Sequence, residues 1–139
     1  MISGLAHVNL TVPPSTLHLA DEFYADTLGL SKRPVPELQR HTLAWFDIGA
    51  SGQQVHIAFG KEPNEPKASR HPCFRLESPE ALLQLRQRIW DHHERGGEAA
   101  PLEADRPGEE SSSFGARGKE YPQRFFARDY AGNRLEFSL

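Results

Sequence analysis

The order of predicted elements repeats once along the chain, and this repeat limits the possible folds more than any other feature of the sequence. Residues 1–60 predict a strand, a helix and three further strands: 5–12, 13–29, 30–35, 41–49 and 53–60. Residues 70–139 predict the same order: 70–78, 78–97, the start of 98–120, 121–129 and 133–139. Each module is too small to bury a good core alone, so the repeat predicts a paired architecture.

The ends of the predicted helices and the segment between the modules complete this interpretation. Ser78 as N-cap, Pro79 at the first helical position and the glycines after residue 95 mark the second helix. Ser15 is the expected N-cap of the first helix, which Gly29 ends. A polar, proline-bearing linker, 61–69, separates module 1–60 from module 70–139. We therefore expect an α+β fold, in which two tandem βαβββ modules form a cupped, barrel-like mixed sheet with helices on the outside.

Composition excludes several classes of partner. The chain has 139 residues and a net charge of −3 with mixed signs, which argues against binding to nucleic acid or to an anionic membrane. No apolar run approaches the roughly 18 residues of a membrane helix, and the first residues lack the features of a signal peptide. Cys73 is the single cysteine, so an intrachain disulfide is impossible. These features predict a cytoplasmic protein, with Cys73 in a packing role.

Four side chains occupy matching places in the two modules. His7 and His71 lie near the start of the first strand of each module, and His56 and Glu136 lie on the last. Each lies on the face opposite the large aliphatic residues, because strand side chains alternate. Three imidazoles and one carboxylate predict a divalent-metal site with room for water or substrate. A single histidine in a strand is more often structural, and we give that interpretation to the helical histidines: His18, His92 and His93.

Five stretches carry a family resemblance: "GLAHVNLTVP", "FYADTLGL", "WFDIGASGQQVHIAFG", "HPCFRL" and "FFARDYAGNRLEF". With them the chain resembles the vicinal oxygen chelate superfamily, which includes glyoxalase I, fosfomycin-resistance enzymes, extradiol dioxygenases and bleomycin-binding proteins. The resemblance implies ligands at His7, His56, His71 and Glu136, and a homodimer in which one site takes ligands from two subunits. The chain departs from the family pattern at Tyr130, where proline is usual, and at His56, where glyoxalase I has glutamate or glutamine.

The function expected from this resemblance is that of a glyoxalase-like lyase or isomerase. A small substrate with two adjacent oxygens would chelate one divalent ion (Zn, Ni, Co, Mn or Fe), and Glu136 would act as the base. Arg124 is a candidate for binding an anionic tail, and loop 101–120 is a candidate lid; a surface cation and a loop without function are the alternatives. Three other functions remain open: an extradiol-type dioxygenase, a thiol transferase of fosfomycin-resistance type and a metal-free drug-sequestering protein of bleomycin-binding type.

Overall fold

The computed structural model describes residues 1–60, 65, 68–109 and 123–139. The chain divides into two compact units, Met1–Asn64 and Glu65–Leu139. Each unit contains a four-stranded sheet and a helical segment, and both follow the predicted order of elements. The α+β class and the two tandem βαβββ modules are therefore confirmed. The described strands pair into two separate sheets, and not into one closed sheet.

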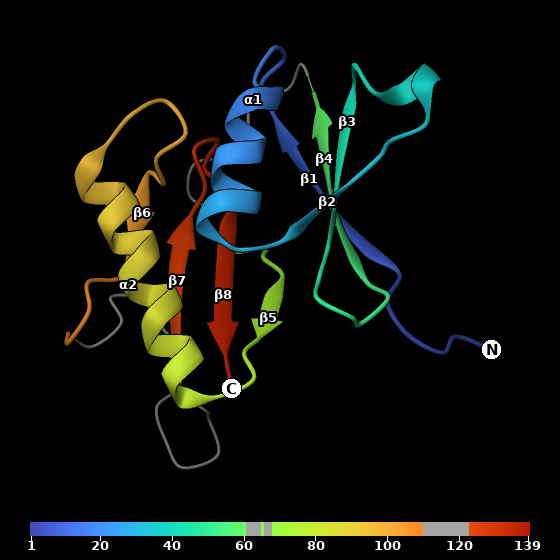
Figure 1. Cartoon of the computed structure of the whole chain (residues 1–139). Coiled ribbons are helices and arrows are strands. Elements are labelled where there is room, and N and C mark those ends of the chain that lie inside the picture. The colour runs from blue at the N-terminus through green and yellow to red at the C-terminus, as the bar shows by residue number, and fades with distance from the viewer. Residues whose placement is uncertain (61–64, 66–67, 110–122) are drawn as a thin grey trace. The chain divides into compact units, whose positions relative to one another are not determined.

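The first unit contains a four-stranded mixed sheet (Figure 1). Its elements are β1 (His7–Val12), α1 (Leu17–Ala20), the π-helix η1 (Asp21–Thr27), β2 (Ser31–Arg33), the 3₁₀-helix η2 (Glu37–Gln39), β3 (Leu43–Asp47) and β4 (Gln54–Phe59). The strand order is β1-β4-β3-β2, in which β1 runs parallel to β4 and the other pairs are antiparallel. Phe23 and Tyr24 of η1 are fully buried with Phe46 of β3, so the helical segment covers the aliphatic face.

The second unit repeats this arrangement with the order β5-β8-β7-β6 (Figure 1). Its elements are β5 (Cys73–Arg75), α2 (Pro79–Arg95), β6 (Glu103–Ala104), β7 (Arg124–Arg128) and β8 (Arg134–Ser138). Ser78 caps α2 by accepting a hydrogen bond from the backbone N–H of Ala81 at 3.1 Å, as predicted. Leu85 and Ile89 are buried on one face of α2, and Phe125 stacks on Phe137 with ring centroids 4.8 Å apart. The helix therefore leaves the opposite face of the sheet to Glu136.

Local details differ from three of the predictions. Ser15 is not the N-cap of α1: it adopts φ 66°, and Thr16 takes the cap position. Strand β5 begins at Cys73, so His71 precedes the strand instead of lying within it. Cys73 is exposed, which contradicts a packing role. His92, by contrast, is buried on α2, which agrees with its structural interpretation.

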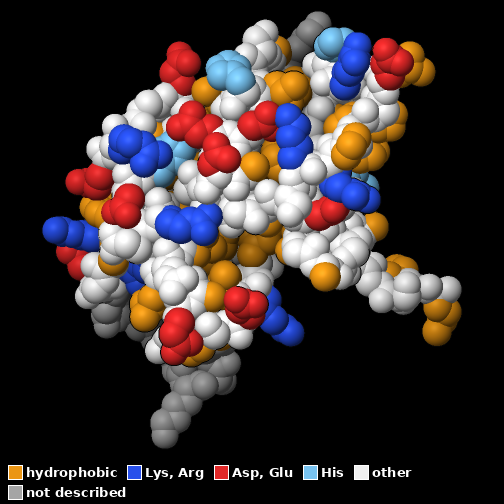
Figure 2. All heavy atoms as spheres, in the orientation of Figure 1, with side chains coloured by type: hydrophobic (Ala, Val, Ile, Leu, Met, Phe, Trp, Pro, Cys, Tyr) orange, Lys and Arg blue, Asp and Glu red, His pale blue; other side chains and the backbone are white. Residues whose placement is uncertain are grey.

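The surface charge, the helix lengths and the predicted lid complete the description. Lys and Arg side chains are interspersed with Asp and Glu over the face drawn in Figure 2. Within the described ranges, no helix has the length and apolar character needed to cross a membrane. The predicted lid falls mostly outside the described residues, since 110–120 belong to its length.

Candidate metal centre

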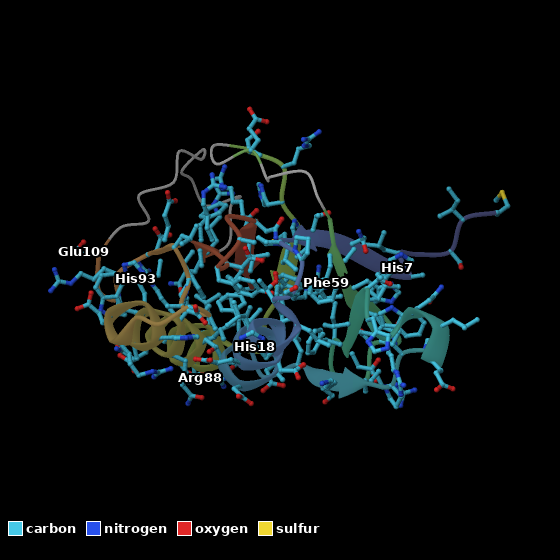
Figure 3. The ribbon with its side chains drawn as sticks, turned by 90° about the horizontal axis from the view of Figure 1, so that it is seen from above. His7, His18, Phe59, Arg88, His93 and Glu109 are labelled. Atoms are coloured by element: carbon cyan, nitrogen blue, oxygen red, sulfur yellow. The ribbon has the colours of Figure 1, made fainter. Side chains whose placement is uncertain are left out.

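The first unit places two of the predicted ligands in a stack of aromatic rings. His7, labelled in Figure 3, begins β1, and His56 lies on the neighbouring strand β4. Their ring centroids are 4.0 Å apart, with an angle of 12° between the planes. Trp45 of β3 stacks on the other side of His56 at 4.7 Å. The stack arises because strand alternation places these residues on one face, and it fixes the plane of the His56 ring between two neighbours.

A hydrogen-bonded chain sets the tautomer of His56. Gln54 donates its amide N–H to Asp47 Oδ1 at 2.8 Å, so its carbonyl oxygen Oε1 faces His56 Nε2 at 2.9 Å. An amide oxygen only accepts, and Nε2 of His56 therefore carries the hydrogen in this arrangement. The lone pair then resides on Nδ1. Burial, and secondarily the charge of His7, hold the pKa of His56 below its ordinary value, which favours the neutral form that binds metals.

The second unit brings the other two predicted ligands into direct contact. His71 Nε2 lies 2.8 Å from Glu136 Oε2, although the two residues are 65 positions apart in the sequence. Glu136 is buried, and Arg124 Nη1 lies 3.2 Å from its second oxygen, Oε1. Both carboxylate oxygens of Glu136 therefore have polar partners. The contact forms because β8 carries Glu136 beside the backbone that leads into β5, where the Glu136 N–H donates to the carbonyl of Pro72 at 3.0 Å.

The His71 ring requires a cation at its second nitrogen. Its Nδ1 faces the backbone carbonyl of Ser69, which only accepts, so Nδ1 carries a hydrogen. Its Nε2 faces the Glu136 carboxylate, which also accepts when it is ionised. Two lone pairs at 2.8 Å repel each other, and either a proton or a metal ion must lie between them. A hydrogen bond from the distant nitrogen to a carbonyl is also the usual support of a metal-binding histidine.

The four predicted ligands thus fall into two pairs, one in each unit. Within the described part of the chain, no three His, Cys, Asp or Glu side chains form a group that could hold a metal ion. Each pair fits a divalent ion in its chemistry, since one supplies neutral imidazole and the other a nitrogen and an oxygen that need a shared proton or metal ion. The complete four-ligand centre stays a prediction. His18 and His93 lie on helical segments and not on a strand (Figure 3), which agrees with their structural interpretation.

Several side chains of the site were not identified from the sequence. Trp45, Gln54 and Asp47 surround His56, and the signal that points to them is the alternation that places all three on its face. Phe126 is the corresponding residue in the second unit, where its ring meets His71 edge-on at 5.6 Å. Arg124, predicted as a substrate-binding residue, contacts Glu136 and lies over the same ring.

Comparison with known proteins gives a consistent result for the fold. The sequence matches no family model and no curated protein. Among solved structures, a protein from Bacillus anthracis described as a glyoxalase family member is 25% identical, with a TM-score of 0.69 over 99% of this chain and 94% of that chain. The fosfomycin resistance protein FosX of Listeria monocytogenes, solved as a variant with Mn(II) and 1S,2S-dihydroxypropylphosphonic acid, is 19% identical, with a TM-score of 0.68 over 99% and 92% of the two chains.

A lactoylglutathione lyase from Agrobacterium tumefaciens is 18% identical, with a TM-score of 0.63 over 99% of this chain and 93% of that chain. The chain has the fold of the vicinal oxygen chelate superfamily. This finding confirms the resemblance predicted from the five sequence stretches.

Proposed function

We propose that this chain is a metal-dependent enzyme of glyoxalase-like type, acting as a lyase or isomerase on a small substrate with two adjacent oxygens. The single observation that supports it most is the contact between His71 and Glu136, where a proton or a metal ion must lie between two acceptors. His7 and His56 are the proposed remaining ligands, and the lowered pKa of His56 supports that role. When bound, the divalent ion polarises a chelated carbonyl and stabilises the negative charge that develops on it.

The protein groups around this site have separate tasks in the proposed reaction. Glu136 would move the proton: one carboxylate oxygen would accept the proton from the substrate carbon beside the carbonyl and return it in forming the product. Arg124 Nη1, 3.2 Å from Oε1, would keep the carboxylate oriented while the other oxygen takes the proton. Gln54 and Asp47 hold the His56 ring in one tautomer and plane. The stack of Trp45 on His56 excludes water from one face of that ring.

The assembly proposed for this enzyme is a homodimer that shares its metal sites. Strands β1 and β5 each form the outer strand of their sheet in the described residues, so each has an edge available for pairing. A shared site would complete each pair of ligands with the pair from another subunit. Sedimentation at micromolar concentration tests this arrangement, because a monomer that still binds metal contradicts it.

Turnover of a substrate panel tests the proposed activity. Chelator-treated protein and protein reloaded with Zn, Ni, Co, Mn or Fe are offered α-oxo thiohemiacetals, catechols and epoxides. We expect thiohemiacetal turnover that disappears on chelation and returns with metal. Turnover of catechols alone would instead support the dioxygenase, and epoxide opening by a thiol the transferase. Ligand binding that is indifferent to chelation, without any turnover, would support the metal-free binding protein.

A further inference from the structure

Two guanidinium groups flank Phe126 on the sheet face that carries Glu136. Phe126 of β7 is paired directly with Glu136 of β8, so their side chains share a face. The Cζ atom of Arg134 lies 4.4 Å from the centroid of the Phe126 ring, and that of Arg124 lies 5.6 Å from it. Both distances are within the range of a cation–π contact. The ring therefore holds two planar cations beside the carboxylate of the proposed metal centre.

The charges of this face are not balanced at Arg134. Arg128 has an acidic partner in Glu103, with Nε and Oε2 3.2 Å apart, and donates further hydrogen bonds to two backbone carbonyls. Arg124 has Glu136. No described residue forms an ion pair or hydrogen bond with Arg134, although its side chain is half-buried and its register partner across the strands is the like-charged Arg128. Like charges in directly opposed positions destabilise a sheet, so this arrangement has a cost in the protein alone.

We infer that Arg134, together with Arg124, binds an oxyanion of the substrate beside Glu136, which makes the substrate of this site a small anion. The inference rests on the proposed function, because it assigns a substrate class to that centre. A guanidinium stacked on an aromatic ring keeps its plane fixed and presents its N–H edge to a carboxylate, phosphonate or phosphate group. A bound oxyanion would supply negative charge that the described residues of this face do not supply to Arg134.

A metal ion at Glu136 would increase the need for a negatively charged group beside Arg134. If Glu136 gives an oxygen to a divalent ion, less of its negative charge remains for Arg124, and the positive charge of the face increases. Arg134 lies two residues before Glu136 on β8, so the two side chains are about 6–7 Å apart along the same face. A single small molecule is long enough to place its oxyanion at Arg134 and its chelating oxygens at the metal. Arg134 is thus the proposed specificity-determining residue.

Binding of inorganic phosphate to metal-loaded protein tests the inference at constant ionic strength. Metal affinity is measured first by calorimetry, and phosphate is titrated afterwards. We expect Arg134→Gln to weaken phosphate binding by about tenfold or more, because a charge-assisted hydrogen bond is lost. Arg134→Lys should restore part of it, since the charge returns without the planar fork. Arg95→Gln, which makes the same charge change in the last turn of α2, is the matched control and should behave as wild type.

The outcomes separate this inference from the proposed function. All these variants should bind metal like wild type, since Arg134 and Arg95 are not proposed ligands. Equal phosphate affinity in Arg134→Gln and wild type overturns the inference, as does metal-loaded wild type that binds no phosphate at millimolar concentration. If wild type takes up no metal, the proposed function fails, and the same titration is made on the metal-free chain. If the metal-free wild type binds phosphate and Arg134→Gln binds it more weakly, the anion site is supported. If the two metal-free proteins bind phosphate with equal affinity, the anion site is overturned.

Discussion

In the first unit His7 and His56 stack face to face with ring centroids 4.0 Å apart, whereas in the second unit His71 meets the Glu136 carboxylate at 2.8 Å. The first pair contains no carboxylate, and burial of His56 opposes a second positive charge beside His7. The second pair needs a proton or a metal ion between its two facing atoms, because both are acceptors. Matching positions in a repeat therefore need not be equivalent: one pair offers neutral donors, and the other offers charge.

Because only the second pair contains a carboxylate, we expect replacement of Glu136 to have the largest effect on activity. Glu136→Gln keeps the shape and an oxygen donor but loses the charge and the basicity. We expect turnover to fall by roughly two orders of magnitude or more, as for loss of a general base. The measurement is the turnover number with metal occupancy held at saturation. Wild-type turnover under that condition would show that the second pair does not supply the base.

Replacing one histidine in each unit tests whether the His7–His56 pair and the His71–Glu136 pair bind the same metal ion. We expect His7→Ala and His71→Ala each to weaken metal binding by at least about tenfold, because each removes a ligand. Calorimetric titration with Zn²⁺ measures both affinities, and His18→Ala serves as the control on an exposed helical histidine. Loss of affinity in His71→Ala alone would assign the metal to the second unit and leave the aromatic stack of the first unit a structural feature.

The helices of the two units differ at their N-termini, and this difference predicts a smaller effect on stability. Ser78 accepts the hydrogen bond of the Ala81 N–H, whereas the side chain of Thr16 makes no capping bond to α1 and donates to the carbonyl of Pro13 at 2.7 Å. Ser78→Ala should lower the free energy of unfolding by about 1 kcal/mol, and Thr16→Ala by less. Chemical denaturation measures both. A larger loss in Thr16→Ala would contradict the assigned caps.

The smallest effect expected is the pH dependence of the first pair. The folded-state pKa of His56 is lowered by burial and by His7, so the unfolded chain binds more protons as the pH falls below about 6.5. As the pH is lowered below about 6.5, the free energy of unfolding of the metal-free protein should therefore decrease. Above this pH the contribution of His56 should be constant. His56→Gln should flatten this dependence when Tm is measured against pH, with His18→Gln as control. An unchanged slope would show that the stack does not oppose protonation. The effect is small, since His56 is only half-buried.

The sequence allowed the elements to be predicted where local signals were strong. Ser78, Pro79 and Gly96 fixed the bounds of α2, and alternation placed His56 and Glu136 on the faces opposite the aliphatic residues. The first helix was less well predicted, because its start has no side-chain cap and Leu28 N–H bonds to the carbonyl of Phe23, five residues earlier. Such i→i−5 bonds leave no distinct pattern of residues.

The partners of the site residues were harder to predict, because they depend on strand pairing. Gln54 and Asp47 support His56 only once β3 and β4 pair in their observed register. The exposure of Cys73 follows from its place on the outer strand of its sheet, which the order of elements along the sequence does not reveal. The position of Arg134 over Phe126 likewise requires the register of β7 and β8.

Metal uptake by the wild-type protein tests the central claim most directly. Chelator-treated protein is titrated with Zn, Ni, Co, Mn and Fe(II) by calorimetry, and bound metal is then measured by elemental analysis. The account predicts about one divalent ion per chain, with a proton released on binding as the ion takes its place between His71 and Glu136. Proton release is measured by comparing binding enthalpies in buffers of different ionisation enthalpy. Protein that takes up none of these ions would contradict the account, because the His7–His56 and His71–Glu136 pairs would then be structural.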